Sequence, residues 1–186
     1  TPVDGNVIDL QRFAKLGKQG VLLLMADSTN ACHPGYTMSE KTVGEKLDNL
    51  FSKGKGRIIV ATFASNIHRL QQIINSSIKY GRKVAFSGRS MEKISDVAVK
   101  LGYLDMPEGL LVDLKDLRLY NNDQITIVTT GSQGEPMSAL TRIASSTHKN
   151  IQIEKDDMII ISASPIPGNE KAVSRVINEL THKGAE

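Results

Sequence analysis

Aromatic side chains are scarce in this chain. It has no tryptophan, and the three large aromatic residue types together make up only 4% of its 186 residues. A core built from this composition must rely on isoleucine, leucine, valine, alanine and methionine. Hydrophobic residues make up 40% and charged residues 23%, which is ordinary for a globular protein. At this length we expect one domain with a substantial core.

Cysteine is almost absent, because Cys32 is the only one. An intrachain disulfide is therefore excluded, and the composition favours a reducing, cytoplasmic setting. We predict that Cys32 is a small buried thiol rather than a nucleophile.

Long apolar runs are also missing, and none approaches the roughly 20 residues of a membrane-spanning helix. We therefore expect no membrane partner. The N-terminal TPVDGNVIDL has neither the basic nor the apolar region of a signal peptide. The chain does not start with methionine, and we expect a processed chain or a piece of a longer protein. The net charge of +3 permits a polyanionic partner without requiring one.

Several catalytic and cofactor motifs do not occur. The four histidines lack H-x-H or H-x-x-x-H spacing, which argues against a metal site within the chain. There is no G-x-S-x-G elbow, no G-x-G-x-x-G fingerprint and no phosphate loop of the G-x-x-x-x-G-K-[ST] type. Asp27 and Glu135 could act as acid–base groups, although acidic residues at strand ends are common. The residues alone predict a polyanion-binding domain without a complete hydrolytic site.

Strand-like and helix-like patterns alternate along nearly the whole chain. This alternation predicts an α/β fold with a mostly parallel, doubly wound, Rossmann-like sheet and helices on both faces. Residues 110–119 are expected to hold a short strand and a helical turn. The predicted strands are 21–26, 57–62, 83–86, 124–129 and 158–161. The predicted helices lie within 5–20, between Ser39 and Phe51, from Ile67 to the stop at Gly81, from Ser90 to Gly102, from Pro136 to Ala144, and 170–182.

Small hydroxyls, amides and glycines follow each predicted strand, in the sequences DSTN, FASN, SGRS, TTGSQGEP and SASPIPGN. Carboxyl ends of parallel strands meet at one edge of a sheet, which is where ligands bind in open α/β folds. Such residues also serve as ordinary helix N-caps and turns. Arg89 favours the ligand interpretation, because a guanidinium among hydroxyls near a helix start suits a phosphate. The alternative for Arg89 is a surface salt bridge.

At these same loops the chain resembles bacterial ribonuclease J. The matching stretches are DSTNA (27–31), ATFASNIHRLQQ (61–72), GRSMEK (88–93), TTGSQGEPMSAL (129–140) and SASPIPGNE (162–170). The resemblance implies that residues 1–186 form a single β-CASP domain, with residues 1–20 as the lead-in from a metallo-β-lactamase domain outside this chain. Because the family's H-x-H-x-D-H motif is absent, the two divalent metals of the full-length enzyme, expected to be zinc, would be held elsewhere.

The same resemblance implies an activity and partners. Members of the family hydrolyse RNA as 5′-to-3′ exonucleases that favour a 5′ monophosphate, and also as endonucleases, in mRNA decay and rRNA maturation. The expected partners are single-stranded RNA, the metallo-β-lactamase domain of the same chain, and a further copy or a paralogue. The chain alone is predicted to be inactive.

Roles of individual residues follow from the resemblance. Asp27 matches an acidic residue that supports the catalytic centre from outside the metal ligands. Gly88, Arg89 and Ser90 match the loop that receives the RNA 5′ phosphate. The residues that match loops along the RNA path are Ser132, Gly134, Ser162 and Ser164, with Ser65 and Asn66 at a further loop end.

Two alternatives remain open from the sequence. One is a stand-alone α/β module that binds a small phosphorylated ligand. The other is a paralogue that serves mainly as an assembly subunit.

Overall fold

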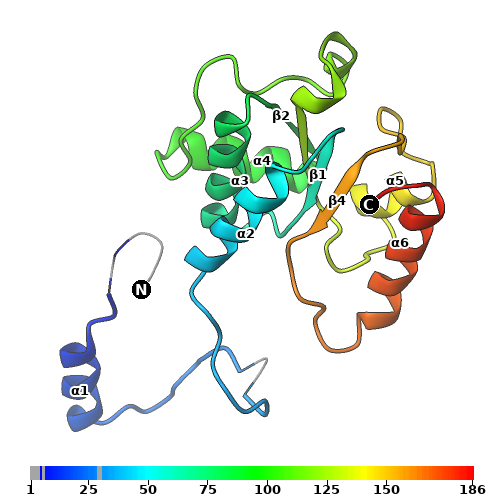
Figure 1. Cartoon of the computed structure of the whole chain (residues 1–186). Helices are drawn as coiled ribbons and strands as arrows, with labels where there is room; N and C mark the ends of the chain where they lie inside the picture. Colours follow the sequence, from blue (N-terminus) through cyan, green and yellow to red (C-terminus); the bar gives the residue numbers. More distant parts are fainter. Residues whose placement is uncertain (1–4, 6, 29–30) are drawn as a thin grey trace. The chain divides into compact units, whose positions relative to one another are not determined.

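The computed structural model describes residues 5, 7–28 and 31–186, and it divides into two compact units, Thr1–Val43 and Gly44–Glu186. Figure 1 shows the chain coloured along its sequence. The α-helices are α1 (Leu10–Gln19), α2 (Lys41–Phe51), α3 (Ile67–Lys79), α4 (Arg89–Lys100), α5 (Ala139–Ala144) and α6 (Glu170–His182). The strands are β1 (Ile58–Ala61), β2 (Lys83–Ser87), β3 (Ile125–Thr129) and β4 (Met158–Ile161). Two short 3₁₀ helices, η1 (Leu117–Leu119) and η2 (Asn122–Gln124), precede β3.

The second unit contains a four-stranded sheet in the order β2-β3-β1-β4, and every pair of neighbouring strands is parallel. Each strand is followed by a helix, as a parallel sheet requires. The predicted α/β, doubly wound class is therefore confirmed. Most strand residues are aliphatic. β1, β3 and nearly all of β2 are buried, as expected for strands covered on both faces, whereas β4 is mostly half-buried.

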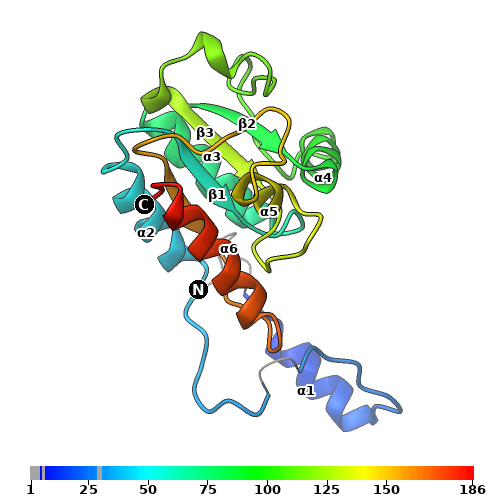
Figure 2. The ribbon, with the colours of Figure 1, turned by 90° about the vertical axis from the view of Figure 1, so that its right-hand side faces the viewer.

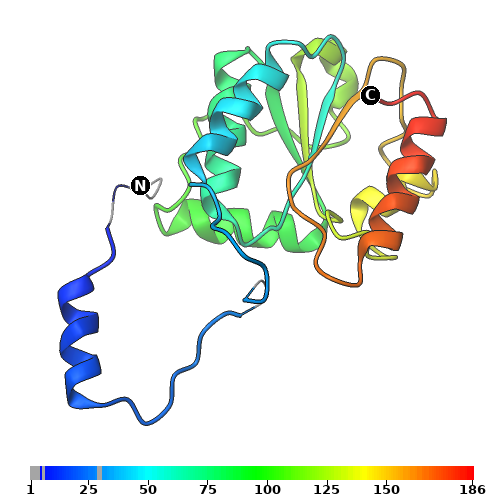
Figure 3. The same cartoon turned by 60° about the horizontal axis from the view of Figure 1, so that its bottom comes forward.

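Helices cover both faces of this sheet. Figure 2 looks onto the face covered by α5 and α6, and Figure 3 shows α2, α3 and α4 on the opposite side of the strands. Alternate strand residues face α5 and α6, because side chains along a strand point to opposite faces. These strand residues and residues of α5 and α6 form a buried hydrophobic cluster, which includes Ile59, Ala61, Ile125, Ile127, Leu140, Ile143, Val176 and Leu180. The core is aliphatic, as the composition predicted.

In the first unit, the helix predicted within residues 5–20 is present as α1. Asp9 caps it by accepting a hydrogen bond from the backbone N–H of Arg12 at 2.9 Å. The prediction of a strand at residues 21–26 is wrong. No described residue pairs with this segment as a β-ladder, and its side chains are exposed. Cys32 is also exposed rather than buried. Both predictions assumed a covering surface that the described part of this unit does not supply.

The other element boundaries agree with the sequence prediction to within about two residues, apart from the start of α5. α5 begins at Ala139, where Ser138 is the N-cap, so Pro136 lies in the preceding turn and Met137 is exposed. The reason is that Ser138 Oγ accepts a hydrogen bond from the backbone N–H of Thr141 and so defines the first helical turn. α4 begins one residue early, at Arg89. Between residues 110 and 119, Leu111 forms a parallel bridge with Val84, followed by η1.

A candidate nucleic-acid interface at the carboxyl edge of the sheet

The four strands end at the same level. Ala61 is in register with both Thr129 and Ile161, and Thr129 is in register with Ser87. Backbone hydrogen bonds continue this pairing into the loops, for example from the N–H of Ser162 to the carbonyl of Ala61 at 2.8 Å. Four loops therefore leave one edge side by side. They contain every predicted site residue except Asp27.

The loop after β2 begins the helix that contains Arg89. Gly88 is the N-cap residue of α4 and has a φ of 117°, a conformation that side chains disfavour. A Cβ at Gly88 would also lie 2.7 Å from Thr130 Oγ1, so glycine allows this loop to approach the loop after β3. Arg89 and Ser90 are exposed in the first turn of α4, and no described side chain caps that helix. A helix start with an exposed guanidinium is a suitable place for an anion.

The loop after β3 is folded tightly onto its neighbours. There is no room for a side chain at Gly131, because a Cβ there would collide with Ser138 Oγ. Gly134 has a φ of 70°, and a Cβ there would lie 2.6 Å from the backbone carbon of Ala172 in α6. Ser132 is only 2% exposed. The loop thus presents mainly its backbone, and the Ser132 hydroxyl offers little surface to a ligand.

Gln133, which the sequence reasoning missed, joins the loops after β3 and β4. Its amide is buried, and Nε2 donates to the carbonyl of Ser164 at 3.0 Å. Its Oε1 accepts from the backbone N–H of Ile166 at 2.7 Å. An amide can form both bonds at once because it is donor and acceptor together. Gln133 therefore determines where exposed Ser164 lies.

Arg69 on α3 is a second residue that the sequence did not single out. It is 9% exposed, and Nη1 donates to the carbonyl of Ser162 at 2.6 Å and to its Oγ at 2.5 Å. This contact ties the loop after β4 to α3. Asn66, in the loop after β1, is the N-cap of α3, and its Oδ1 accepts from the backbone N–H of Arg69 at 3.0 Å. Ser65 beside it is exposed.

His148 is the third missed residue, and it contacts the end of β2. Its Nδ1 accepts hydrogen bonds from the backbone N–H groups of Ile151 at 3.1 Å and Asn150 at 3.3 Å. Its Nε2 lies 3.0 Å from Ser87 Oγ. Burial lowers the pKa of His148, and the nearby charge of Arg142 lowers it further. The ring is therefore neutral near pH 7, with its proton on Nε2.

The acidic side chains of the edge are turned back onto their own loops. A carboxylate oxygen of Glu135 accepts from the backbone N–H of Gln133 at 3.2 Å, and one of Glu170 accepts from Gly168 at 2.8 Å. These contacts explain Glu135 as a loop-stabilising residue. Asp27 lies in the unit Thr1–Val43, and its predicted role stays a prediction.

The described residues do not fit a metal cofactor. No group of three or more histidine, cysteine, aspartate or glutamate side chains among them is arranged to hold a metal ion. The two divalent metals that the resemblance implies are not assigned to this chain. Within the same residues, no helix has the length and apolarity needed to cross a membrane.

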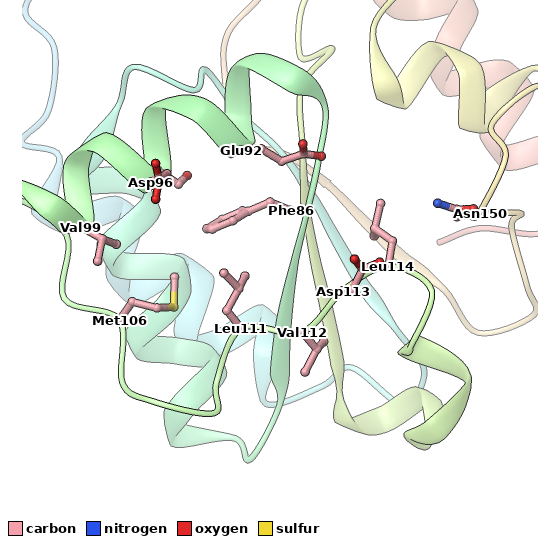
Figure 4. Close-up of a pocket in the computed structure, with 11 residues that line it drawn as sticks. Phe86, Glu92, Asp96, Val99, Met106, Leu111, Val112, Asp113, Leu114 and Asn150 are labelled. Carbon is pink, nitrogen blue, oxygen red and sulfur yellow. The ribbon is translucent and has the colours of Figure 1, made fainter.

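A separate cavity of about 590 Å³ lies between α4 and residues 106–114. Figure 4 shows Phe86, Met106 and Leu111 around it, together with the carboxylates of Glu92 and Asp96 on α4. Asp113 contributes a third carboxylate. Three carboxylates repel phosphate groups, so this cavity does not extend the candidate RNA-binding edge.

The family follows from the segment that contains this edge. A sequence model described as the β-CASP domain of ribonuclease J matches residues 55–180, which include all four strands and their loops. The chain belongs to this family. The resemblance seen in the loop motifs is thereby confirmed.

Individual relatives are similar over the whole chain. Ribonuclease J of Thermus thermophilus is 51% identical over 187 aligned residues, and the alignment covers all of this chain and 32% of that protein. Ribonuclease J of Helicobacter pylori strain 26695 is 50% identical over 186 residues, or 27% of its length. Ribonuclease J2 of Bacillus subtilis is 40% identical over 186 residues, or 34% of its length. This β-CASP chain thus spans about a third or less of these relatives.

Proposed function

We propose that this chain is the RNA-binding β-CASP part of a ribonuclease J, and that the loops at the carboxyl edge hold the 5′ end of single-stranded RNA. The observation that supports this best is the start of α4. There Arg89 and Ser90 are exposed in the first turn of a 12-residue helix, beside the loops that follow the three other strands at the same level. The relatives' names and the family match support RNA as the substrate.

Each part of the edge has a chemical task in this proposal. The guanidinium of Arg89 binds the terminal phosphate through charge-assisted hydrogen bonds, and the Gly88–Ser90 backbone adds the positive end of α4. Ser164 and the backbone of the loop 131–134 line the path of the following nucleotides, with Ser65 and Ser162 at its margins. Holding the 5′ phosphate at a set place defines the distance from the RNA end to the scissile bond.

Cleavage itself is assigned to the remainder of a longer protein. We propose that a metallo-β-lactamase domain of the same protein supplies two divalent metals, expected to be zinc, and that Asp27 supports that centre. The whole enzyme would act in the cytoplasm as a 5′-to-3′ exonuclease that favours a 5′ monophosphate, and also as an endonuclease. It would assemble with a further copy or a paralogue. The chain alone is proposed to bind RNA without cleaving it.

The Arg89→Ala substitution tests this function in the full-length ribonuclease. We expect the preference for 5′-monophosphorylated over 5′-hydroxylated RNA to fall about tenfold or more, as loss of a charge-assisted hydrogen bond implies. The measurement is the ratio of hydrolysis rates for two oligonucleotides that differ only at the 5′ end.

Lys93→Ala is the matched control, since Lys93 is an exposed cation one turn further along the same helix. It should leave the ratio nearly unchanged. An Arg89→Ala enzyme with the wild-type ratio would contradict the assignment of this loop to the 5′ phosphate. An equal fall of this ratio in Arg89→Ala and Lys93→Ala would indicate general electrostatic attraction of RNA instead.

A further inference from the structure

His148 joins two segments that the chain separates by 61 residues. On one side its Nδ1 accepts from two successive backbone N–H groups, those of Asn150 and Ile151. On the other side its Nε2 reaches Ser87 Oγ. Nδ1 can accept only when it bears no proton, so Nε2 must be the protonated nitrogen and the donor to Ser87. Only the neutral Nε2–H tautomer satisfies all three contacts.

Ser87 is the last residue of β2 and is fully buried. Its carbonyl accepts a hydrogen bond from the backbone N–H of Thr130 at 3.3 Å, so it also touches the start of the loop after β3. Gly88, the next residue, lies tightly against the Thr130 side chain. A shift of Ser87 would therefore move the loop Gly88–Ser90, because Gly88 follows Ser87 directly and lies close against Thr130.

We propose that His148 is a positioning residue, which holds Ser87 and thereby keeps the loop Gly88–Ser90 in the shape that receives the RNA 5′ phosphate. This inference rests on the proposed function of that loop. His148 does not touch the phosphate in this arrangement. Its effect reaches Arg89 through the end of β2.

The same contacts make the arrangement sensitive to acid. A second proton would have to sit on Nδ1, where it would face the two N–H groups of Asn150 and Ile151 without an acceptor. Arg142, from α5, is the charged side chain whose field acts on the ring, and it opposes protonation as burial does. Protonation of the ring removes its hydrogen bonds to the backbone of residues 150–151, and His148 then holds Ser87 less firmly.

The test uses the full-length ribonuclease and the ratio of hydrolysis rates for 5′-monophosphorylated and 5′-hydroxylated RNA. His148→Asn places an amide oxygen where Nδ1 lies, so the two backbone donors keep an acceptor while the bond to Ser87 is lost. Ser87→Ala removes the same bond from the other side. We expect each variant to lower the ratio about three- to tenfold, the usual effect of one neutral hydrogen bond. The double variant should lower it no further, because both changes remove one interaction.

His182→Asn is the matched control, since His182 is exposed in the last turn of α6, and its ratio should equal that of the wild type. The wild-type ratio should also decline as the pH falls below about 6.5, the ordinary pKa of histidine, with a smaller decline in His148→Asn. A ratio unchanged in both His148→Asn and Ser87→Ala would overturn the inference, as would equal losses on both RNAs.

Two further outcomes separate this inference from the proposed function. If circular dichroism shows that His148→Asn does not fold, the Ser87→Ala variant alone tests the role of His148, because this substitution deletes a single oxygen atom. A wild-type enzyme that hydrolyses RNA without any dependence on the 5′ group would overturn the proposed role of Gly88–Ser90. A wild-type preference that survives in both variants would overturn only the role of His148.

Discussion

Aliphatic residues are mostly buried in one of the two units and mostly exposed in the other. In Gly44–Glu186, the strand residues Ile58, Ile59 and Val60 are completely buried. In Thr1–Val43, the run from Val21 to Met25 has similar side chains, yet Leu22 is fully exposed and no described residue of that unit is buried. The two segments thus have similar apolar side chains. They differ in burial because, among the described residues, only the strand in Gly44–Glu186 has neighbouring strands and helices that cover it. A strand is stable only where other strands satisfy its backbone and other layers cover its side chains.

The largest effect is expected for the buried ion pair of the second unit. Asp157 is completely buried and accepts from Arg57 Nε at 2.8 Å, while its Oδ2 also accepts from the backbone N–H of Glu154 at 2.8 Å. Asp157→Ala would remove the buried, two-point partner of the Arg57 guanidinium and leave it only the half-exposed carboxylate of Glu154 as an ion pair, which should cost about 3–5 kcal/mol of unfolding free energy. Urea denaturation of the 186-residue chain measures it.

Asp96→Ala is the control for that substitution, because Asp96 pairs with Lys100 on the exposed face of α4 at 2.6 Å. Its cost should stay within about 0.5 kcal/mol. Equal costs for Asp157→Ala and Asp96→Ala would show that the pair at Arg57 is not desolvated as the structure has it.

A paired aliphatic substitution compares the two units directly. Ile127→Ala, in the centre of β3, should lower the unfolding free energy by about 2–5 kcal/mol, since it leaves a cavity between the sheet and α5. Leu23→Ala should change it by less than about 0.5 kcal/mol, because Leu23 is 73% exposed. Thermal and urea unfolding of both variants give the comparison. A large cost at Leu23 would mean that residues 21–26 are covered in solution.

The smallest expected effect concerns acid stability. The pKa of His148 is lowered in the folded chain by burial and by Arg142, so the unfolded chain binds a proton more readily. The contribution of His148 to stability is complete above its ordinary pKa of 6.5 and is lost as the pH falls below that value. His148→Asn should flatten this part of the stability curve. Urea unfolding at a series of pH values measures the slope, and identical slopes would show that the ring titrates normally.

Local patterns predicted most of the second unit. Four of the five predicted strands, the last helix and the turn signals agree with the structure because continuous β-branched runs and regularly spaced apolar residues satisfy one arrangement only. The start of α5 was predicted at Pro136, but Ser138 is the N-cap. Both residue types are common at helix starts, and the hydrogen bond from the backbone N–H of Ala139 to Thr130 Oγ1 favours the start after Ser138.

The candidate site was predicted in its loops but not in its supports. Arg69, Gln133 and His148 each contact a residue at least 31 positions away, and sequence spacing has no signal for such pairs. Arg69 lies among the buried residues of α3, whereas Gln133 and His148 lie in loops that have no apolar pattern. Neither the burial of Ser132 nor the exposure of Ser164 can be read from these serine-containing loop sequences.

The sequence by itself determined the α/β class, the aliphatic core, the family and the gathering of glycines and hydroxyls at the strand ends, because these depend on residue type and near spacing. The tertiary structure alone decided the strand order, the exposure of residues 21–26 and the network through which Arg69, Gln133 and His148 support the edge. The physical reason is that burial and hydrogen bonding of a polar side chain are settled by atoms far away in the chain, which only the folded arrangement brings within reach.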